Sequence, residues 1–478
     1  MLVFGSSPQR NSNVFILGAG VLDGSWVDNY LLTGPDGDAC LRMEDLITRG
    51  ALRRAVLRRA TELAGAGLGA GGTVSLRLPP SLTYVVNLLA AWHLGAQVSL
   101  LDHRLTQHEV DRALHRLAPQ LLVSAPGATI GPLRGYTAAE AVTTRRDGEP
   151  ARTDHVLLQL SSGSTGPSKV IGRSAASLVA EVQRYQQIDG APRAGERMVL
   201  LASMVHVLGL VGGLLYALHT GVRLVLPRFL STDGVLAAIA SGTEPTTVIG
   251  VPFHLAVLTA VDQPPRLPQL TRVTVGGELV RPAVRAAFAD RYAVPLGTMY
   301  GMTELGVIAT DLYGQSQPAL RPAPGMTLRE EGGEVLVAVE RSPYVGLTEP
   351  GRWLGGWLHT RDAGTVDPAT GLVTIQGRLD SQVSVGGLKV DLTEVEHCLC
   401  GLPGVAEAVV VYGGAIEAFV VLDDPSAAAG LKEALAARLA PYKRPRRMNL
   451  LTRLPRTATG KLVRDARTLA TAERAQLP

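Results

Sequence analysis

The chain has 478 residues, of which 46% are hydrophobic and 18% are charged, and its formal net charge is +4. This composition excludes a disordered chain, and the length suits about two to four domains. Aromatic residues make up 4% of the chain and basic residues are scattered, so no stacking platform for nucleic acid is expected. No signal peptide or apolar run of about 18 residues occurs, which indicates no membrane partner.

Three cysteines, Cys40, Cys398 and Cys400, form neither an even set nor a zinc-binding pattern. Disulfides are therefore not expected, and a reducing, cytoplasmic location fits. A local basic run from Tyr442 to Arg447 has two open interpretations: a docking surface for an anionic partner, or a solvated loop.

Strands and helices alternate after an irregular first 40 residues. Predicted strands cover residues 73–78, 97–101, 120–124, 156–160, 198–201, 222–226, 247–250 and 272–275. Predicted helices cover residues 43–64, 81–94, 106–117, 174–186, 211–219, 233–240 and 254–261. The alternation predicts an α/β fold with parallel-rich sheets and helices on both faces, and residues 125–152 are expected to form a surface connection.

The pattern changes after residue 320. Short predicted strands at 334–339, 357–360 and 372–376 indicate a small β-rich subdomain over about residues 320–378. A compact tail of mixed strands and helices follows Asp380. The expected division is a large domain over residues 1–378 and a small α+β domain over residues 379–478.

The segment Leu160–Lys169 is rich in serine and glycine and follows the predicted strand 156–160. Its glycines let backbone N–H groups close on an oxyanion, its hydroxyls add donors, and Lys169 adds a positive charge. Such a loop suits the β- and γ-phosphates of a nucleotide. It differs from the common phosphate loop G-x-x-x-x-G-K-[ST], because Ser168 stands directly before Lys169. The alternative is a flexible surface loop.

The segment Tyr300–Glu304 is expected to follow an apolar strand. Tyr300 can stack on a purine, Thr303 can donate to a phosphate, and Glu304 can bind Mg²⁺ through oxygen. The alternative for Tyr300 is simple packing on the core.

Two later segments carry single candidate residues. His359–Asp362 is expected to close a short strand, and a loop aspartate there can accept both hydroxyls of a ribose or, alternatively, cap backbone amides. Near the C-terminus, Lys461 follows a proline- and glycine-containing stretch. It is either an exposed cation or a cation that a mobile domain delivers to a closing active site.

Taken in order, these segments resemble the acyl-adenylate-forming superfamily of acyl-CoA synthetases, aryl acid ligases, nonribosomal adenylation domains, luciferases and adenylating amide synthetases. The resemblance runs from about residue 45 to residue 467, and it rests on Ser161–Lys169, Tyr300–Glu304, Thr360–Asp362, Gly377–Glu396 and Pro455–Arg464. It implies a large N-terminal α/β domain, a mobile C-terminal domain, and a hinge at Asp380.

The resemblance also implies a role for each matching residue. The loop that handles pyrophosphate matches Ser161, Ser162, Gly163, Ser164, Thr165, Gly166 and Lys169. The nucleotide walls match Gly276, Gly277, Glu278, Met299, Tyr300 and Gly301, and the ribose contacts match Asp362 and Arg378. The catalytic group matches Lys461, Thr303 at the α-phosphate, His206 near the reacting carboxylate, and Glu304 with Thr165 at Mg²⁺. The acyl pocket matches His206, Val207, Gly209, Pro252 and Phe253, and the acceptor side matches Gly386, Gly387 and Lys389. A histidine packed in the core is the alternative for His206.

Four departures from the family pattern are visible. Pro167 stands one place early in the loop, and Arg361 replaces the usual glycine before Asp362. Ser384 stands where many members carry a lysine linked to the second half-reaction. No aspartate follows His206, and the apolar run after it favours an aryl or alkyl acid over an α-amino acid.

The expected activity is adenylation of an aryl or apolar carboxylic acid by ATP with Mg²⁺, followed by transfer to CoA or to the thiol of an acidic carrier protein. Direct transfer to a small amine is the alternative that Ser384 keeps open. A non-catalytic acyl-adenylate-binding protein is disfavoured because Lys169, Glu304 and Lys461 occur together. A P-loop NTPase is disfavoured because the Gly-Lys step is absent.

Overall fold

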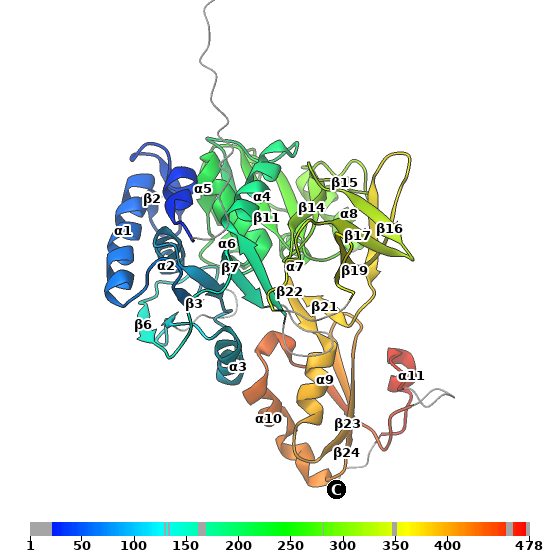
Figure 1. The fold of residues 1–478 in the computed structure, drawn as a ribbon. Coiled ribbons are helices and arrows are strands. Elements are labelled where there is room, and N and C mark those ends of the chain that lie inside the picture. Colours follow the sequence, from blue (N-terminus) through cyan, green and yellow to red (C-terminus); the bar gives the residue numbers. More distant parts are fainter. Residues whose placement is uncertain are drawn as a thin grey trace, which may run out of the picture.

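A computed structural model describes residues 22–128, 131, 134–160, 169–280, 282–346, 351–455 and 462–474. Figure 1 shows a large body built from the first three quarters of the chain, with a smaller C-terminal part attached below it. Along the described residues, no helix is both long enough and apolar enough to cross a lipid bilayer.

The first sheet of the large body has a parallel centre and antiparallel edges. Its strand order is β6 (Val142–Arg145), β5 (Leu121–Ser124), β3 (Thr73–Arg77), β4 (Gln97–Leu100), β7 (His155–Leu160) and β8 (Val170–Ser174). Strands β5, β3, β4 and β7 run parallel, whereas β6 and β8 pair antiparallel at the two edges. The helices of this region are α1 (Arg49–Gly65), α2 (Leu82–His93), α3 (Gln107–Leu117) and α4 (Ala175–Gln187).

The second sheet is longer and also mainly parallel. Its order is β15 (Arg321–Pro322), β14 (Gly306–Asp311), β13 (Leu296–Met302), β12 (Leu270–Gly276), β11 (Thr246–Gly250), β9 (Arg197–Leu200), β10 (Arg223–Val225), β1 (Ala39–Arg42) and β2 (Leu46–Thr48). The associated helices are η1 (Val27–Leu31), η2 (Leu208–Leu215), α5 (Tyr216–Thr220), α6 (Thr232–Ala240), α7 (Pro252–Leu258) and α8 (Pro282–Tyr292). The largest apolar cluster joins α1, α2 and β3 to α4, η2 and β9, so the two sheets share one core.

A third sheet is antiparallel and lies beside the second. It contains β16 (Leu328–Glu331), β17 (Glu334–Ala338), β19 (Trp357–Val366), β18 (Trp353–Leu354) and β20 (Val373–Arg378). The strand β19 is ten residues long, and its central residues alternate between buried and half-buried positions.

The C-terminal part begins with the hairpin of β21 (Gln382–Val385) and β22 (Leu388–Asp391). The remaining elements are α9 (Leu392–Cys400), β23 (Val405–Tyr412), β24 (Ile416–Leu422), η3 (Pro425–Gly430), α10 (Leu431–Arg438), η4 (Pro441–Lys443), β25 (Arg447–Leu450) and α11 (Ala466–Ala470). One face of the β23–β24–β25 sheet packs on α9 and α10. The opposite face packs on Leu454, Leu462 and Leu469 of the final segment.

The fold class expected from the sequence is confirmed: parallel-rich sheets with helices form the large domain, and an α+β domain follows it. Local boundaries differ. The predicted helix 43–64 begins only at Arg49, because Thr48 is its N-cap and accepts a hydrogen bond from Ala51 N at 3.2 Å, while residues 46–48 pair as β2. The first 40 residues and the 125–152 connection also hold short elements, namely η1 and β6.

Two motifs expected in loops lie within strands. Tyr300 is inside β13, and Asp362 is in the middle of β19, directly across from Arg378 on β20. The loop assignment for Asp362 is therefore wrong. The ladder continues because backbone pairing with β17 and β20 carries β19 past the Thr360–Asp362 motif.

Candidate active site

A cavity of about 810 Å³ lies where the carboxyl ends of parallel strands from both large sheets meet. Segments following β4, β9, β11 and β12 line it, together with the end of β13. Ligands of open α/β sheets usually bind at the carboxyl ends of strands, so this is the expected position of an active site. The β21–β22 hairpin closes the cavity from the C-terminal side.

Most of the residues predicted for the site line this cavity. They are Lys169, His206, Val207, Gly209, Gly276, Gly277, Met299, Tyr300, Gly301, Thr303, Glu304, Arg378, Gly386, Gly387 and Lys389. Segments far apart in the sequence are therefore brought together, and they include described residues from three of the five motifs: Ser161–Lys169, Tyr300–Glu304 and Gly377–Glu396.

Other predicted residues lie elsewhere. Pro252 and Phe253 are not among the described residues that line the cavity, and Phe253 is 46% exposed. Their neighbours Val251 and His254 line it instead. The reason is that Pro252 begins α7, so the helix turns the next side chain outward and brings His254 back to the cavity.

Further predicted residues border the cavity or fall outside the described chain. Glu278, Asp362 and Asp380 contact residues that line it without being part of its described lining. The loop residues Ser161, Ser162, Gly163, Ser164, Thr165 and Gly166, with Pro167, and the catalytic candidate Lys461 lie outside the described residues.

Glu304 is buried at the cavity and is held by two neighbours. Tyr344 donates a hydrogen bond from its hydroxyl to Glu304 Oε1 at 3.0 Å, and Arg352 Nη2 lies 3.8 Å from the same oxygen. No cluster of three or more His, Cys, Asp or Glu side chains that could hold a metal occurs in the described part of the chain. A lone carboxylate still fits Mg²⁺, which is commonly bound by one or two carboxylates together with substrate phosphates.

Arg378 connects the predicted ribose contact to the predicted hinge. Its Nη1 lies 2.9 Å from Asp362 Oδ1, and its Nε and Nη2 bind Asp380 in a bidentate pair at 2.9 and 2.5 Å. Tyr300 donates its hydroxyl to Asp362 Oδ2 at 2.6 Å. Although burial opposes it, the charges of Asp362 and Asp380 raise the pKa of Arg378 above its ordinary value. The Arg378 guanidinium therefore links Asp362, beside the cavity, to Asp380 at the start of the C-terminal part.

Arg361, which departs from the family's glycine, adopts a left-handed backbone with φ of 62°. Its backbone N–H donates to Glu334 Oε1 at 2.7 Å, and its Nη1 lies 3.8 Å from Glu334 Oε2. Glycine is favoured at such a position because it has no Cβ to strain. The structure thus explains why a glycine is common there.

We expect Arg361→Gly to be more stable than Arg361→Ala by about 1 kcal/mol, because only glycine relieves the left-handed strain. Both variants lose the same guanidinium contact with Glu334, so the difference in their stability reports the backbone strain alone. Urea unfolding of the two variants measures the difference. Equal stability of the two would show that φ at this position carries no strain.

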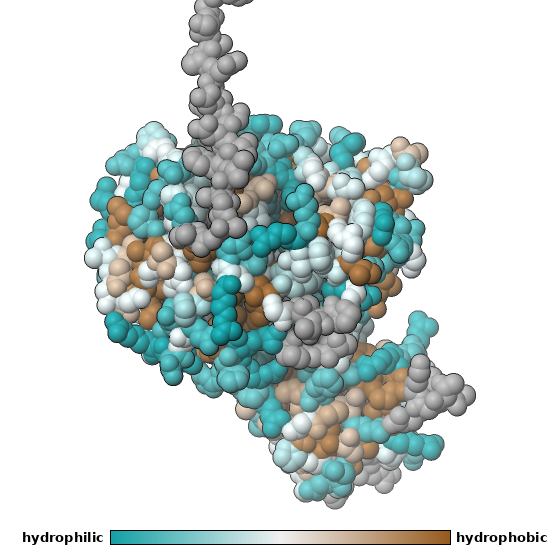
Figure 2. All heavy atoms as spheres, in the orientation of Figure 1, coloured by the Kyte–Doolittle hydropathy of each residue, from teal (hydrophilic) through white to brown (hydrophobic). Residues whose placement is uncertain are grey.

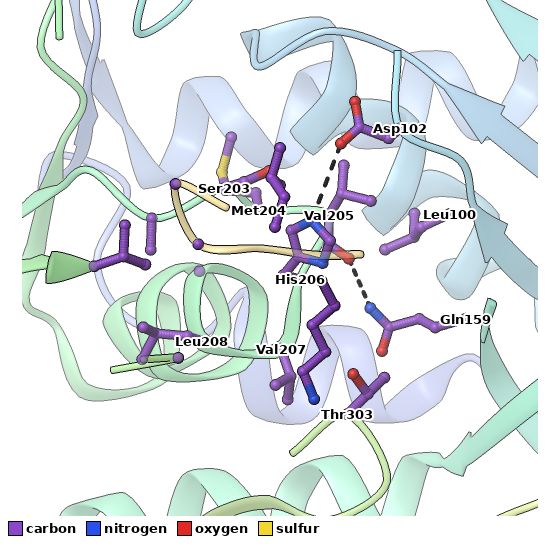
Figure 3. A pocket seen from close by; sticks show the side chains of 18 of the residues that line it. Leu100, Asp102, Gln159, Ser203, Met204, Val205, His206, Val207, Leu208 and Thr303 are labelled. Atoms are coloured by element: carbon purple, nitrogen blue, oxygen red, sulfur yellow. Dashed lines mark hydrogen bonds and ion pairs between the residues drawn. The ribbon is translucent and has the colours of Figure 1, made fainter. Parts of the chain in front are cut away.

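His206 lies on the cavity wall next to two polar side chains, Asp102 and Gln159 (Figure 3). Its Nε2 is 4.0 Å from Asp102 Oδ2. Burial lowers the pKa of His206 to about 4, and Arg104 and Lys389 also lower it, while Asp102 acts in the opposite direction. The ring is therefore neutral near pH 7. His206 is not a core residue, because 40% of its side chain is exposed.

The wall beyond His206 is apolar. It is formed by Leu100, Leu201, Val207, Leu208, Leu226, Leu230 and Val251, with Met204 and Met299. An apolar cavity wall with few polar groups suits an aryl or alkyl substrate group.

The turn of the β21–β22 hairpin reaches into the cavity. Gly387 N donates to Glu278 Oε1 at 2.8 Å, which ties the hairpin to the segment after β12. Lys389, on β22, lines the cavity as well. Burial lowers the pKa of Lys389, while the nearby carboxylates of Glu304, Asp362 and Asp380 act to raise it. In this arrangement the hairpin brings the Lys389 amine to the cavity.

A buried ion pair joins the C-terminal part to the large body. Lys443 Nζ lies 2.9 Å from Glu109 of α3 and 3.1 Å from Glu394 of α9. Although burial opposes it, Glu394 and Glu109 raise the pKa of Lys443 above its ordinary value. Figure 1 shows α10 beside α3, where Thr106 donates its hydroxyl to Arg438 O at 3.2 Å. Figure 2 shows mainly hydrophilic side chains on the lower face of the large body near this joint.

This ion pair accounts for part of the basic run. Lys443 is buried, and Arg444 donates to the carbonyls of Leu439 and Ala436. Arg446 and Arg447 remain exposed. Half of the cations in Lys443–Arg447 are therefore used within the protein rather than offered to a partner.

For the two half-reactions that the family resemblance implies, Lys443→Met should slow acyl transfer about tenfold relative to adenylation, because it leaves Glu109 and Glu394 buried without their cation and disfavours this domain orientation. Rates of the two half-reactions and the melting temperature would be measured together. Arg447→Met, at an exposed cation of the same run, is the matched control. Equal slowing of both half-reactions by Lys443→Met would contradict an orientation effect.

Several site residues were missed from the sequence. Asp102, Gln159 and His254 line the cavity, and Tyr344 and Arg352 hold Glu304. Asp102 had a usable signal, since it directly follows the predicted strand 97–101 and the carboxyl ends of parallel strands carry sites. Tyr344 and Arg352 lie outside the named strands and far from Glu304 in the sequence, so their contacts had none.

The AMP-binding enzyme family model matches residues 32–352, and the AMP-binding enzyme C-terminal domain model matches residues 394–461. The chain is 27% identical over 464 residues to the p-hydroxybenzoic acid–AMP ligase FadD22 of Mycobacterium tuberculosis, covering 88% of this chain and 65% of that protein. It thus spans slightly less than two thirds of that relative. It is 28% identical to a feruloyl-CoA synthase of an Amycolatopsis species, covering 92% of this chain and 97% of the relative.

Among solved structures, the amide bond synthetase McbA from Marinactinospora thermotolerans superposes with a TM-score of 0.73 at 25% identity, covering 92% of this chain and 98% of that one. The two family models together match both parts of the fold and most of the residues that line the cavity. The chain therefore belongs to the AMP-binding enzyme family.

Proposed function

We propose that the protein joins an aryl or apolar carboxylic acid to AMP, releases pyrophosphate, and then transfers the acyl group to a thiol, either of CoA or of an acidic carrier protein. The observation that carries this proposal is the composition of one cavity. An apolar wall around His206 faces Thr303, Glu304 and Arg378, which are the residue types needed to hold a nucleotide.

The first step brings a carboxylate against the α-phosphate, so positive charge must offset the two anions. Lys461 is proposed to supply it, with Thr303 contacting the α-phosphate and Glu304 holding Mg²⁺ with Thr165. Bound Mg²⁺ would neutralise phosphate charge. Lys169 and the Ser161–Gly166 loop are proposed to hold the leaving pyrophosphate.

The second step is proposed to use the arrangement of Figure 1, in which the β21–β22 hairpin closes the cavity. The C-terminal domain, taken as residues 379–478, would turn about Asp380 between the steps. Arg378 supports this location because it binds Asp380 and Asp362 together. We place the protein in the cytoplasm, since Cys40, Cys398 and Cys400 are unpaired thiols.

A primary amine is the second candidate acceptor. Ser384 replaces the lysine linked to the second half-reaction, and its hydroxyl is buried without a hydrogen-bond partner among the described residues. The similarity to an amide bond synthetase supports the same alternative.

Acid-dependent exchange of labelled pyrophosphate into ATP, screened over aryl and alkyl carboxylic acids, tests the first step. We expect exchange with at least one apolar acid and none with α-amino acids. Adding CoA, a phosphopantetheinylated carrier protein or n-butylamine to the active acid then tests the acceptor. A thioester supports the main proposal, an amide alone supports the alternative, and absence of exchange with every acid would contradict both.

A further inference from the structure

The carboxyl end of β4 places a buried carboxylate beside the histidine of the cavity. Asp102 is 6% exposed, and its Oδ2 lies 4.0 Å from His206 Nε2 (Figure 3). This Nε2 is buried and has no hydrogen-bond partner in the described part of the chain. The other ring nitrogen, Nδ1, lies on the side away from Asp102 (Figure 3). The His206 ring thus turns Nε2 toward the Asp102 carboxylate, while another part of the ring stays open to the cavity.

Gln159 adds a second unsatisfied group to the same wall. Its Nε2 donates to Val205 O at 2.6 Å, which holds the backbone just before His206 (Figure 3). Its Oε1 is buried and has no partner among the residues that the structure describes. Buried acceptors normally have partners, so an unsatisfied one that lines a cavity points to a ligand that donates hydrogen.

We propose that, in the transfer step, Asp102 orients His206 and that His206 Nδ1 takes the proton of the attacking thiol or amine. The inference rests on the proposed function and assigns a base to its second half-reaction. His206 would touch the acceptor directly. Asp102 would act through His206 and is a positioning residue.

Among the charges around the ring, that of Asp102 favours this division of roles, whereas Arg104 and Lys389 oppose protonation of His206. Burial opposes it, but the hydrogen bonds and charge of Arg104 hold the pKa of Asp102 well below its usual range, so its carboxylate is ionised. The charged groups that face His206 are Asp102, Arg104 and Lys389. A neutral imidazole beside an ionised carboxylate can accept a proton, and the carboxylate offsets the charge that forms.

In the transfer step, one bond forms at the acyl carbon and one bond breaks there. The sulfur or nitrogen of the acceptor forms a bond to the acyl carbon, and the bond from this carbon to the phosphate oxygen of AMP breaks. AMP leaves with the bonding electron pair. The acceptor's proton goes to His206 Nδ1, and the resulting imidazolium lies next to Asp102.

The position of Asp102 also depends on the C-terminal domain. Arg104 binds Asp102 through Nε at 2.8 Å and Nη2 at 2.5 Å. The same guanidinium lies over the ring of Tyr442, 5.5 Å from its centroid. The carboxylate that orients His206 is therefore held by a residue that contacts the domain carrying the hairpin, which couples the base to the orientation used for transfer.

Single-turnover transfer tests the assignment. Wild type, His206→Asn and Asp102→Asn are first allowed to form the acyl-adenylate from ATP and acid, and CoA or n-butylamine is then added. We expect transfer at pH 7 to slow about 100-fold in His206→Asn and about tenfold in Asp102→Asn, and in both variants to slow more than pyrophosphate exchange does, since both residues also line the cavity. Asp154→Asn, which breaks an Asp–Arg pair outside the cavity, is the control.

The pH dependence separates a base from a structural role. A free cysteine thiol has a pKa of about 8.5, and the thiolate fraction of a thiol such as CoA rises steeply between pH 7 and pH 9.5, which reduces the need for a base. The CoA deficit of His206→Asn should then shrink at least about tenfold. Transfer by His206→Asn within threefold of wild type at pH 7, or an equal deficit at pH 7 and pH 9.5, would overturn the inference while leaving the proposed function intact. Failure of wild type to exchange pyrophosphate with any acid would instead overturn that function.

Discussion

Gly387→Ala should slow acyl transfer by at least about 100-fold, equivalent to about 2.7 kcal/mol, while adenylation slows by less than about threefold. A Cβ at Gly387 would lie 2.6 Å from Val251 Cγ1 and 2.9 Å from Cγ2. Val251 is buried between β11 and α7, so it cannot move easily. The added methyl group would therefore keep the hairpin out of the cavity. Acid-dependent pyrophosphate exchange and single-turnover transfer from preformed acyl-adenylate measure the two effects separately.

Gly386→Ala is a matched control on the same turn. Gly386 and Gly387 both have left-handed backbones, with φ of 59° and 81°, so alanine strains each by about 1 kcal/mol. Only Gly387 meets a neighbour, since nothing lies within 4 Å of a Cβ built at Gly386. Transfer should therefore fall much less in Gly386→Ala. Equal loss in the two variants would show that backbone strain, and not insertion of the hairpin against Val251, controls the step.

Much of the fold could be predicted from the sequence because its strands are short apolar runs separated by amphipathic helices. The strand expected at 156–160 is β7, and the one expected at 247–250 is β11. The same local pattern failed for Tyr300 and Asp362, which lie within strands. The polar residues in those strands indicate a loop when only the sequence is considered. Pairing across β13–β14 and β19–β20 supplies the hydrogen bonds that extend the strands through these residues.

The motif residues of the site could be placed because each sits in a recognisable segment, whereas their partners could not. Nothing near Glu109 in the sequence indicates that Lys443, more than 300 residues later, neutralises it. Asp102 reads as the polar end of a strand, and only the packing of the first sheet against the second brings it to His206. Contacts between elements distant in sequence depend on how the sheets and domains pack, which no local pattern records.

Lys461→Ala should give the opposite result to Gly387→Ala. We expect pyrophosphate exchange to fall by about 100- to 1,000-fold, or about 2.7–4 kcal/mol, because the cation would act where charge develops in the transition state. Transfer from supplied acyl-adenylate should change by less than about threefold, since the hairpin lines the cavity in the arrangement proposed for that step.

The segments on either side of Lys461 support two separate orientations. Leu454 and Leu462 pack on Val409 and Phe419, on the face of the C-terminal sheet opposite α9, and they do not line the cavity. We propose that the lysine carried by this segment reaches the α-phosphate when the C-terminal domain turns. Arg467→Ala, at an exposed cation on α11, controls for loss of charge on the same tail. Exchange at the full wild-type rate in Lys461→Ala, with every acid that the wild type accepts, would remove the basis for a rotating domain and for a lysine that serves the first step alone.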